Sequence, residues 1–285
     1  MSSARVLNVT KELLGAEKAG FLGTLDVQAI GVLPIALGSA TKLISFVPAS
    51  DKEYIGELVL GMSTVTDDTE GAVIERKGAV GLEASAVNEA LQAVASQKTQ
   101  VPPHVSAKRL EGVRGYKALR KEGRLLDFAA TPAAVRSLGI LRDWQDGDLR
   151  HIVFRMTVTP GYYVRGFCRD VGMALGCGGC MGRLLRTKAH GFGIGDTLSL
   201  DQLKRKAALA DWSFVKTGMD SKDLLGALTH VRLNEEQWSA FVHGRSVETG
   251  LMDGAVVTVL RPDGRLGGIG GAADGRIYPR KVFAA

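Results

Sequence analysis

The stretch Gly20-Phe-Leu-Gly-Thr-Leu-Asp26-Val-Gln-Ala-Ile-Gly31-Val-Leu-Pro34 places one carboxylate in an otherwise apolar, glycine-rich run. Burying an ionised carboxylate without partners is unfavourable by on the order of several kcal/mol, so Asp26 should be held by hydrogen bonds and a cation, or should take part in chemistry. The glycines permit a loop whose backbone lies close to a bulky group. Alternatively, Asp26 caps a following helix by accepting hydrogen bonds from amides near Ala29. The stretch alone leaves both interpretations open.

The composition is that of a folded globular protein. The chain has 285 residues, 45% of them hydrophobic and 23% charged. This length allows one large core, or a main domain with a small second one, and the composition excludes general disorder. Apolar stretches end before the roughly 18 residues that a membrane span needs. Because the N-terminus also lacks a basic-then-apolar signal pattern, we expect a cytoplasmic protein without a membrane partner.

The three cysteines bear on whether the chain binds a metal. Cys168, Cys177 and Cys180 are too few for a disulfide framework. Cys177-Gly-Gly-Cys180 has the inner spacing of a zinc knuckle, but a second Cys or His pair at the usual distance is missing. We therefore predict reduced, structurally inert thiols and no metal site, with a zinc-dependent protein as the alternative.

The charge distribution favours a polyanionic partner. The formal net charge is +6, and basic residues gather in clusters that have an aromatic residue within or close to them: Lys108-Arg109, Arg114 to Arg124, Arg183 to Lys188, Lys204 to Lys206 and Arg280-Lys281. Basic loops with interleaved aromatic residues suit an RNA-binding surface. The alternative for each single cluster is a solvated helix face.

Periodicity and turn signals predict the main elements. We expect helices at 3–14, 82–97 and 199–209 and one ending near 175, and strands at 42–47, 53–60, 134–141 and 151–158. The polar run between Met62 and Gly71 predicts a surface loop, and the basic, glycine-broken segment after Pro103 a long excursion. After about residue 227 we expect a small β-rich module with a hairpin around Pro262-Asp263-Gly264.

Several ordered motifs carry a resemblance to a known family. They are Gly20 to Asp26, Gly31 to Pro34, Gly38 to Lys42, Asp51 to Tyr54, Val101 to Pro103, Ser106-Ala107, Gly112 to Arg120, Gly161 to Arg165 and Leu184 to Thr187. In this order the motifs resemble those of the TruB family of tRNA pseudouridine synthases. The C-terminal segment ending Tyr278-Pro-Arg-Lys-Val-Phe283 is similar, more weakly, to the small RNA-contacting domain of some bacterial members.

The resemblance implies an α+β fold with a mixed, largely antiparallel central sheet flanked by helices and loops. A catalytic domain is expected at residues 1–225, with a thumb-like RNA-contacting insertion at about 100–126, followed by a small β-rich, PUA-like domain at 226–285. The first residues align with the middle of the family's first motif. We therefore expect that the true start site lies further upstream and that a preceding strand with a Lys-Pro pair exists.

The resemblance also implies an activity, the isomerisation of uridine 55 in the T-loop of tRNA to pseudouridine on a flipped-out base. Asp26 is then the nucleophile, and Arg165 the cation that keeps it ionised and in place. Tyr54 stacks on the target base, near the point where a proton leaves C5. An isomerisation without redox chemistry or hydrolysis needs no cofactor.

Further residues are expected to bind the substrate. Tyr163 and Leu184 complete an apolar pocket, and the RNA contacts are assigned to Arg186 and to the thumb residues Lys108, Arg109 and Arg114. Phe21 stands where the family usually has His, a change that preserves stacking in place of the flipped base but not hydrogen bonding.

A second hypothesis is a catalytically impaired member that binds or folds tRNA. It is motivated by Phe21, by Val65 at a position that is frequently acidic in the family, and by the missing first strand. Neither hypothesis implies a protein partner, and we expect a monomer.

Overall fold

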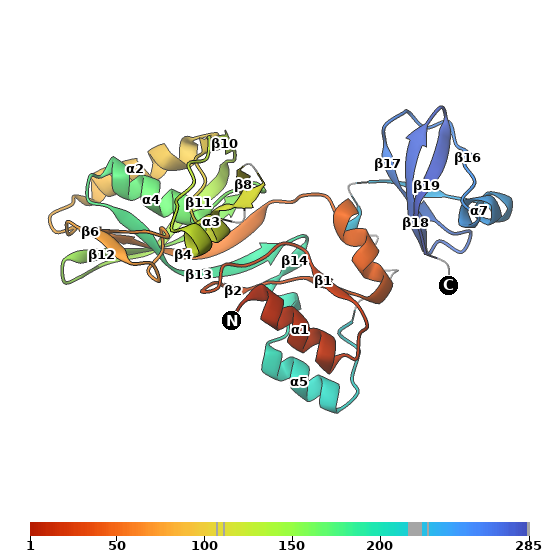
Figure 1. Ribbon diagram of the computed structural model, residues 1–285, viewed down its shortest axis with the longest axis horizontal. Coiled ribbons are helices and arrows are strands. Elements are labelled where there is room, and N and C mark those ends of the chain that lie inside the picture. Colours follow the sequence, from red (N-terminus) through yellow and green to blue (C-terminus); the bar gives the residue numbers. More distant parts are fainter. Residues whose placement is uncertain (107, 111, 216–223, 227, 284–285) are drawn as a thin grey trace. The chain divides into compact units, whose positions relative to one another are not determined.

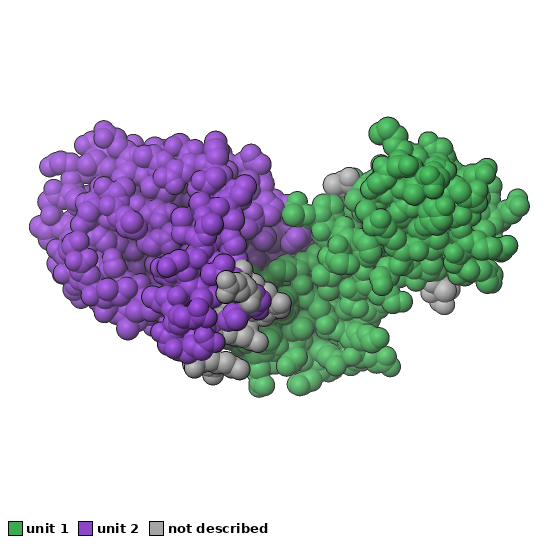
Figure 2. Space-filling model, turned by 45° about the horizontal axis from the view of Figure 1, so that its top comes forward, with its two compact units in different colours: residues 1–24, 33–49, 197–285 green, residues 25–32, 50–196 purple. Residues whose placement is uncertain are grey.

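Contacts within the chain divide it into two compact units. The computed structural model describes residues 1–106, 108–110, 112–215, 224–226 and 228–283 (Figure 1). Unit 1 comprises residues 1–24, 33–49 and 197–285, and unit 2 comprises residues 25–32 and 50–196 (Figure 2). Asp26 therefore belongs to unit 2, although the residues on both sides of its segment belong to unit 1. The expected domain boundary at 225/226 stays a prediction.

Unit 2 is built on a six-stranded sheet with the order β11-β12-β4-β13-β14, to which β2 adds beside β13. The pairing of β2 with β13 is parallel and the other pairings in this sheet are antiparallel. This confirms the predicted mixed, largely antiparallel sheet. The strands are β2 (Ile30–Gly31), β4 (Lys52–Leu60), β11 (Val135–Asp146), β12 (Leu149–Val158), β13 (Gly179–Ala189) and β14 (Phe192–Gly193).

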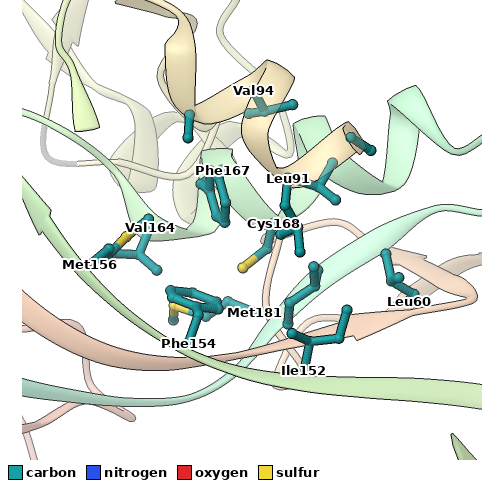
Figure 3. Close-up of a cluster of buried hydrophobic side chains, with 14 of the residues drawn as sticks. Leu60, Leu91, Val94, Ile152, Phe154, Met156, Val164, Phe167, Cys168 and Met181 are labelled. Atoms are coloured by element: carbon teal, nitrogen blue, oxygen red, sulfur yellow. The ribbon is translucent and has the colours of Figure 1, made fainter. Parts of the chain in front are cut away.

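Two helices, α2 (Ala84–Ser96) and α4 (Val164–Ala174), cover one face of this sheet (Figure 1). Alternate residues of β12 point into the core between the sheet and these two helices, as strand periodicity requires. Phe154 of β12 meets Phe167 of α4 edge to face, with ring centroids 5.4 Å apart (Figure 3). Burying a side chain of this size stabilises the fold by about 1.5–3 kcal/mol, so this core fixes α4 on the sheet.

A glycine contact sets the position of α4 still more closely. A Cβ atom on Gly172 of α4 would lie 2.1 Å from the backbone nitrogen of Gly179, at the start of β13. Only glycine permits this approach of helix backbone to strand backbone. The arginine near the start of α4 is thereby held in a defined place relative to β13.

Short elements complete unit 2. They are β5 (Met62–Thr64), β6 (Val73–Arg76), β7 (Thr99–Gln100), β8 (Arg109–Leu110), β9 (Val113–Arg114), α3 (Gly115–Glu122), β10 (Thr131–Pro132) and η2 (Ile194–Asp196). The segment between β7 and β10 has a small core of its own, formed by Ala118, Leu126 and Phe128. It is the expected long excursion, and it is compact.

The first part of unit 1 contains α1 (Ser3–Leu13), β1 (Ala19–Phe21), β3 (Ile35–Leu37), η1 (Gly38–Phe46) and α5 (Leu200–Ala208). The strand expected at 42–47 is wrong, since these residues lie in the 3₁₀ helix η1 and its C-cap. Helical spacing brings Leu43 and Phe46 to one side, where they pack in a cluster with Ile269 of the C-terminal module. This tertiary contact overrides the local strand preference of the apolar run.

The C-terminal module of unit 1 is a five-stranded sheet with the order β15-β17-β18-β19-β16 and one helix, α7 (Glu235–Val242). Its strands are β15 (Thr229–Arg232), β16 (Val247–Glu248), β17 (Val256–Leu260), β18 (Leu266–Ala273) and β19 (Arg276–Val282). The small β-rich module and its hairpin are confirmed. Within the described ranges, the structure has no helix of the length and apolarity that crossing a bilayer requires.

Candidate active site

The loop that carries Asp26, residues 25–32, is attached to β13 by backbone pairing and by one arginine side chain. Ile30 and Gly31 pair in parallel with Leu185 and Arg186. The Val32 amide donates to the Arg186 carbonyl at 2.9 Å, and Arg186 Nε donates to the Val32 carbonyl at 2.8 Å. The Arg186 side chain is fully buried. This buried arginine therefore joins the loop to the sheet, whereas the sequence analysis assigned it a contact with RNA.

Gly31 is required for this attachment. Its φ is +109°, and a Cβ atom would lie 2.2 Å from the Arg186 carbonyl oxygen. We expect Gly31→Ala to lower the thermal unfolding midpoint by at least about 4 °C more than Gly147→Ala, because both variants carry the cost of left-handed backbone but only Gly31→Ala adds a clash with the Arg186 carbonyl. Gly147 also has a positive φ, but a Cβ atom there would meet nothing within 4 Å, so it isolates the conformational cost. Equal midpoints for the two variants would contradict the proposed anchoring.

Asp26 and Arg165 form the central ion pair. Arg165 Nε donates to Asp26 Oδ2 at 2.9 Å, and Nη2 donates to Oδ1 at 3.3 Å. The arginine side chain is 7% exposed and the aspartate side chain 43%. The expected cation is therefore present, on the buried side of a carboxylate that a ligand can still reach. The helix-cap interpretation is wrong, because the residues after Asp26 form a turn closed by the Ala29 amide and the Asp26 carbonyl.

The Arg165 guanidinium has further acceptors that fix its orientation. Nη1 donates to the carbonyls of Thr66 and Val105, both at 2.9 Å, and Nε lies 3.8 Å from Asp68 Oδ2. A planar guanidinium with its donors directed in this way presents a rigid fork to a carboxylate. Asp26 is thus oriented by a cation that is itself held at several points.

Asp68 was missed by the sequence analysis, which predicted a surface loop for its polar run. It is 8% exposed, and its Oδ1 accepts hydrogen bonds from Thr66 Oγ1 at 2.6 Å and from the Glu70 amide at 3.2 Å. The neighbouring Asp67 is equally buried. The available signal in the sequence was a pair of adjacent acidic residues flanked by threonines. Their burial becomes evident only from their contacts with Arg165 and Arg169 of α4.

Tyr54 and Leu184 lie on neighbouring strands of the sheet and belong to one buried cluster. Burial raises the pKa of the Tyr54 phenol above its usual value, the charge and hydrogen bond of Arg186 oppose this, and Asp26 raises it further. The phenol is therefore protonated at neutral pH. It can stack and donate a hydrogen bond next to the Asp26 carboxylate.

Tyr163 is the N-cap residue of α4, two positions before Arg165. The buried side-chain amide of Gln100 forms two hydrogen bonds with the backbone of Tyr163. Its Oε1 accepts from the Tyr163 amide and its Nε2 donates to the Tyr163 carbonyl, both at 2.9 Å. Gln100, which the sequence analysis also missed, therefore fixes the start of the helix that carries Arg165.

Of the other predicted substrate-binding residues, the structure describes the side chains of Lys108 and Phe21. Lys108 Nζ donates to Thr131 Oγ1 at 3.3 Å and lies over the Phe128 ring, 5.8 Å from its centroid. Phe21 lies on β1 of unit 1, opposite Ile35. The side chains of Arg109 and Arg114 lie outside the described part of the chain. The roles of these four residues stay predictions.

The three cysteines lie in the interior of the protein. All three are buried free thiols, and burial raises their pKa values, that of Cys180 to about 12. Among the residues that the structure describes, no group of three or more His, Cys, Asp or Glu side chains is arranged to hold a metal ion.

Three family models match consecutive parts of the chain. The model described as "TruB family pseudouridylate synthase (N terminal domain)" matches residues 11–164. The model "tRNA pseudouridylate synthase B C-terminal domain" matches residues 165–228, and "Pseudouridine synthase II TruB, C-terminal" matches residues 229–283.

Relatives and solved structures agree with these matches. A protein of Nostoc sp. named tRNA pseudouridine synthase B is 33% identical over 275 residues, which cover 96% of this chain and 91% of the relative. A protein of the same name from Cereibacter sphaeroides is 42% identical over 212 residues, covering 73% and 69%. The structure titled "Crystal Structure of a Cbf5-Nop10-Gar1 Complex" matches with a TM-score of 0.68 at 22% identity, covering 95% of this chain and 75% of that chain, and shows the fold.

Proposed function

Because the chain belongs to the TruB family of pseudouridylate synthases, we propose that it converts uridine 55 in the T-loop of tRNA to pseudouridine. The observation that carries this proposal is the Asp26–Arg165 pair, in which a carboxylate is oriented from its buried side and accessible from the other. The names of the relatives, tRNA pseudouridine synthase B, support tRNA as the substrate.

The proposed reaction is an isomerisation, in which substrate and product have the same atoms, and it needs a nucleophile. The bond between N1 of uracil and C1′ of the ribose breaks, the uracil turns, and C5 bonds to C1′ while the C5 proton moves to N1. Asp26 divides this change into easier steps by forming a covalent adduct, at C1′ of the sugar or at C6 of the ring. Both routes need a carboxylate that is held in place, and the two hydrogen bonds from Arg165 hold Asp26 there.

The buried residues around the pair suit a flipped-out base. Extracting the base from a folded loop costs about a few kcal/mol, which stacking and phosphate contacts must offset. Tyr54 supplies a ring for stacking, and Leu184 and Tyr163 supply apolar surface. Because its phenol is protonated, we assign Tyr54 a stacking and hydrogen-bonding role beside Asp26.

Asp68→Asn is expected to lower the single-turnover rate of pseudouridine formation by about tenfold to a hundredfold. The change removes a carboxylate from beside the Arg165 guanidinium and weakens the bonds from Thr66 and Glu70, and hydrogen bonds to charged groups contribute about 1.5–3 kcal/mol. Glu75→Gln on exposed β6 is the control and should leave the rate unchanged. A rate for Asp68→Asn within twofold of wild type would show that Asp68 does not support Arg165.

Position-resolved mapping of pseudouridine on an unmodified tRNA transcript tests the proposal. We expect stoichiometric product at uridine 55 and at no other uridine of the T-loop. A transcript with cytidine at position 55 is the matched control and should yield no product. Product at a different position, or none with a protein that binds the transcript, would contradict the proposed function.

Phe21 favours a second candidate, a tRNA-binding or tRNA-folding protein without catalysis. Since Phe21 can stack but cannot form the hydrogen bonds of the His usual at this position, binding could persist without the chemical step. This candidate predicts tRNA binding that weakens steeply with salt through counterion release, together with no pseudouridine. Measuring binding and product with one preparation separates the two functions.

A further inference from the structure

We propose that Asp67 and Arg169 form a positioning pair for the Asp26–Arg165 centre. The pair holds the turn at residues 64–70 and the thumb root, which we define as residues 101–106, in the places from which both supply acceptors to Arg165. The inference rests on the proposed function and goes beyond it by assigning two residues that do not touch Asp26.

Arg169 lies one helical turn after Arg165 on α4, so both side chains leave the same face of the helix. Its Nη1 lies 3.2 Å from Asp67 Oδ2, its Nη2 donates to the Val101 carbonyl at 2.9 Å, and its Nε donates to Asp170 Oδ1 at 2.9 Å. The guanidinium therefore joins the turn, the thumb root and its own helix.

The turn at residues 64–70 depends on Asp67. Asp67 has a φ of +59°, which short polar side chains tolerate better than most others do. Its carbonyl accepts the Met181 amide of β13 at 2.9 Å, and Thr64 Oγ1 donates to the Asp68 carbonyl at 2.6 Å. Fastened in this way, the turn presents the Thr66 carbonyl and the Asp68 carboxylate to Arg165.

The thumb root lies along the two arginines of α4. Arg165 donates to the Val105 carbonyl and Arg169 to the Val101 carbonyl, each at 2.9 Å. Two donors four residues apart on the helix thus bind two acceptors four residues apart in the thumb root. A displacement of the thumb root at Val101 would therefore also move the Val105 carbonyl, which orients Arg165.

Charge makes this arrangement sensitive to Arg169. Burial raises the pKa of the Asp67 carboxyl, and Asp170 raises it further, whereas the charges of Arg169, then Arg165 and then His104, lower it. Without Arg169, a buried carboxylate would lose its nearest cation, and the turn would have to shift to hydrate it.

A second-site variant tests the pair. At saturating tRNA, Arg169→Gln is expected to lower the single-turnover rate tenfold to a hundredfold, by about the value of charged hydrogen bonds, while the tRNA affinity per active molecule changes less than threefold. Asp67→Asn/Arg169→Gln should react at least about fivefold faster than Arg169→Gln, because no unpaired carboxylate remains and asparagine tolerates the positive φ. Arg169→Lys should lie between wild type and Arg169→Gln, since one ammonium cannot reach all three acceptors.

Arg150→Gln is the matched control. Like Arg169, Arg150 is a partly buried arginine, and it binds an aspartate, Asp143, and a backbone carbonyl, that of Leu82. It should lower stability but leave the rate per active molecule unchanged. If Arg169→Gln behaves like this control, or if the double variant is no faster than Arg169→Gln, the pair has only a structural role and the inference is overturned.

Hydrogen exchange separates this inference from the proposed function. In the free protein, Arg169→Gln should speed amide exchange in residues 64–70 and 101–106, and Arg150→Gln should not. Unchanged exchange in both segments would overturn the inference whatever the activity. If wild type makes no pseudouridine, the proposed function fails, while this exchange measurement still decides whether Asp67 and Arg169 hold the two segments.

Discussion

Asp26→Asn is expected to reduce pseudouridine formation by at least about ten-thousand-fold, which in practice means no detectable product. Asparagine has nearly the same shape, and its carbonyl oxygen can still accept a hydrogen bond from Arg165. It carries no charge, so it cannot form the adduct that divides the reaction into easier steps. Single-turnover conversion of a tRNA transcript at saturating enzyme measures this loss directly.

The control for this variant is Asp51→Asn. Asp51 is a partly exposed carboxylate that pairs with Arg136 at 3.3 Å on the surface of unit 2. Because exposed pairs contribute about 0–1 kcal/mol, this variant should convert tRNA at the wild-type rate. If both variants lost activity together, a general effect of charge would explain the result better than a nucleophile at Asp26.

Arg165→Gln should produce the second largest effect, a fall in rate of at least about a hundredfold. The change removes two charged hydrogen bonds to Asp26, and each such bond contributes about 1.5–3 kcal/mol. It also leaves the carbonyls of Thr66 and Val105 without their donor, so the thermal midpoint should fall as well. Arg165→Lys keeps the charge but loses the fork, and its rate should lie between those of glutamine and arginine.

The rate must be corrected for stability to be informative. Dividing the single-turnover rate by the fraction of enzyme that binds tRNA gives the rate per active molecule. Arg150→Gln, which breaks another arginine–aspartate pair of unit 2, should then match wild type, whereas Arg165→Gln should not. Equal corrected rates for the two variants would show that Arg165 serves the fold alone.

The central contact could be anticipated from the sequence, but only with the family resemblance. A carboxylate in an apolar run requires a partner, yet the chain has 36 lysine and arginine residues and periodicity does not choose among them. The family motif that ends in Arg165 identified this arginine, 139 residues away from Asp26, as the partner. The structure confirms the contact. Its catalytic meaning stays a prediction, as do the roles of Tyr54 and Tyr163.

Local signals predicted the elements whose ends are determined locally. Ser199 begins its helix with a capping box, and β12 has the alternation of apolar residues that a half-buried strand requires. Segments whose structure depends on distant partners were not predictable in this way. The run containing Asp67 and Asp68 has the composition of a surface loop, and it is buried because Arg165 and Arg169 of α4 bind it.

The decisive experiment for Asp26 as the nucleophile is position-resolved pseudouridine formation by wild type and Asp26→Asn on the same tRNA transcript, with binding measured in parallel. We expect full conversion of uridine 55 by wild type and none by Asp26→Asn, with dissociation constants that agree within about threefold. Conversion by Asp26→Asn at a rate within tenfold of wild type would contradict this role.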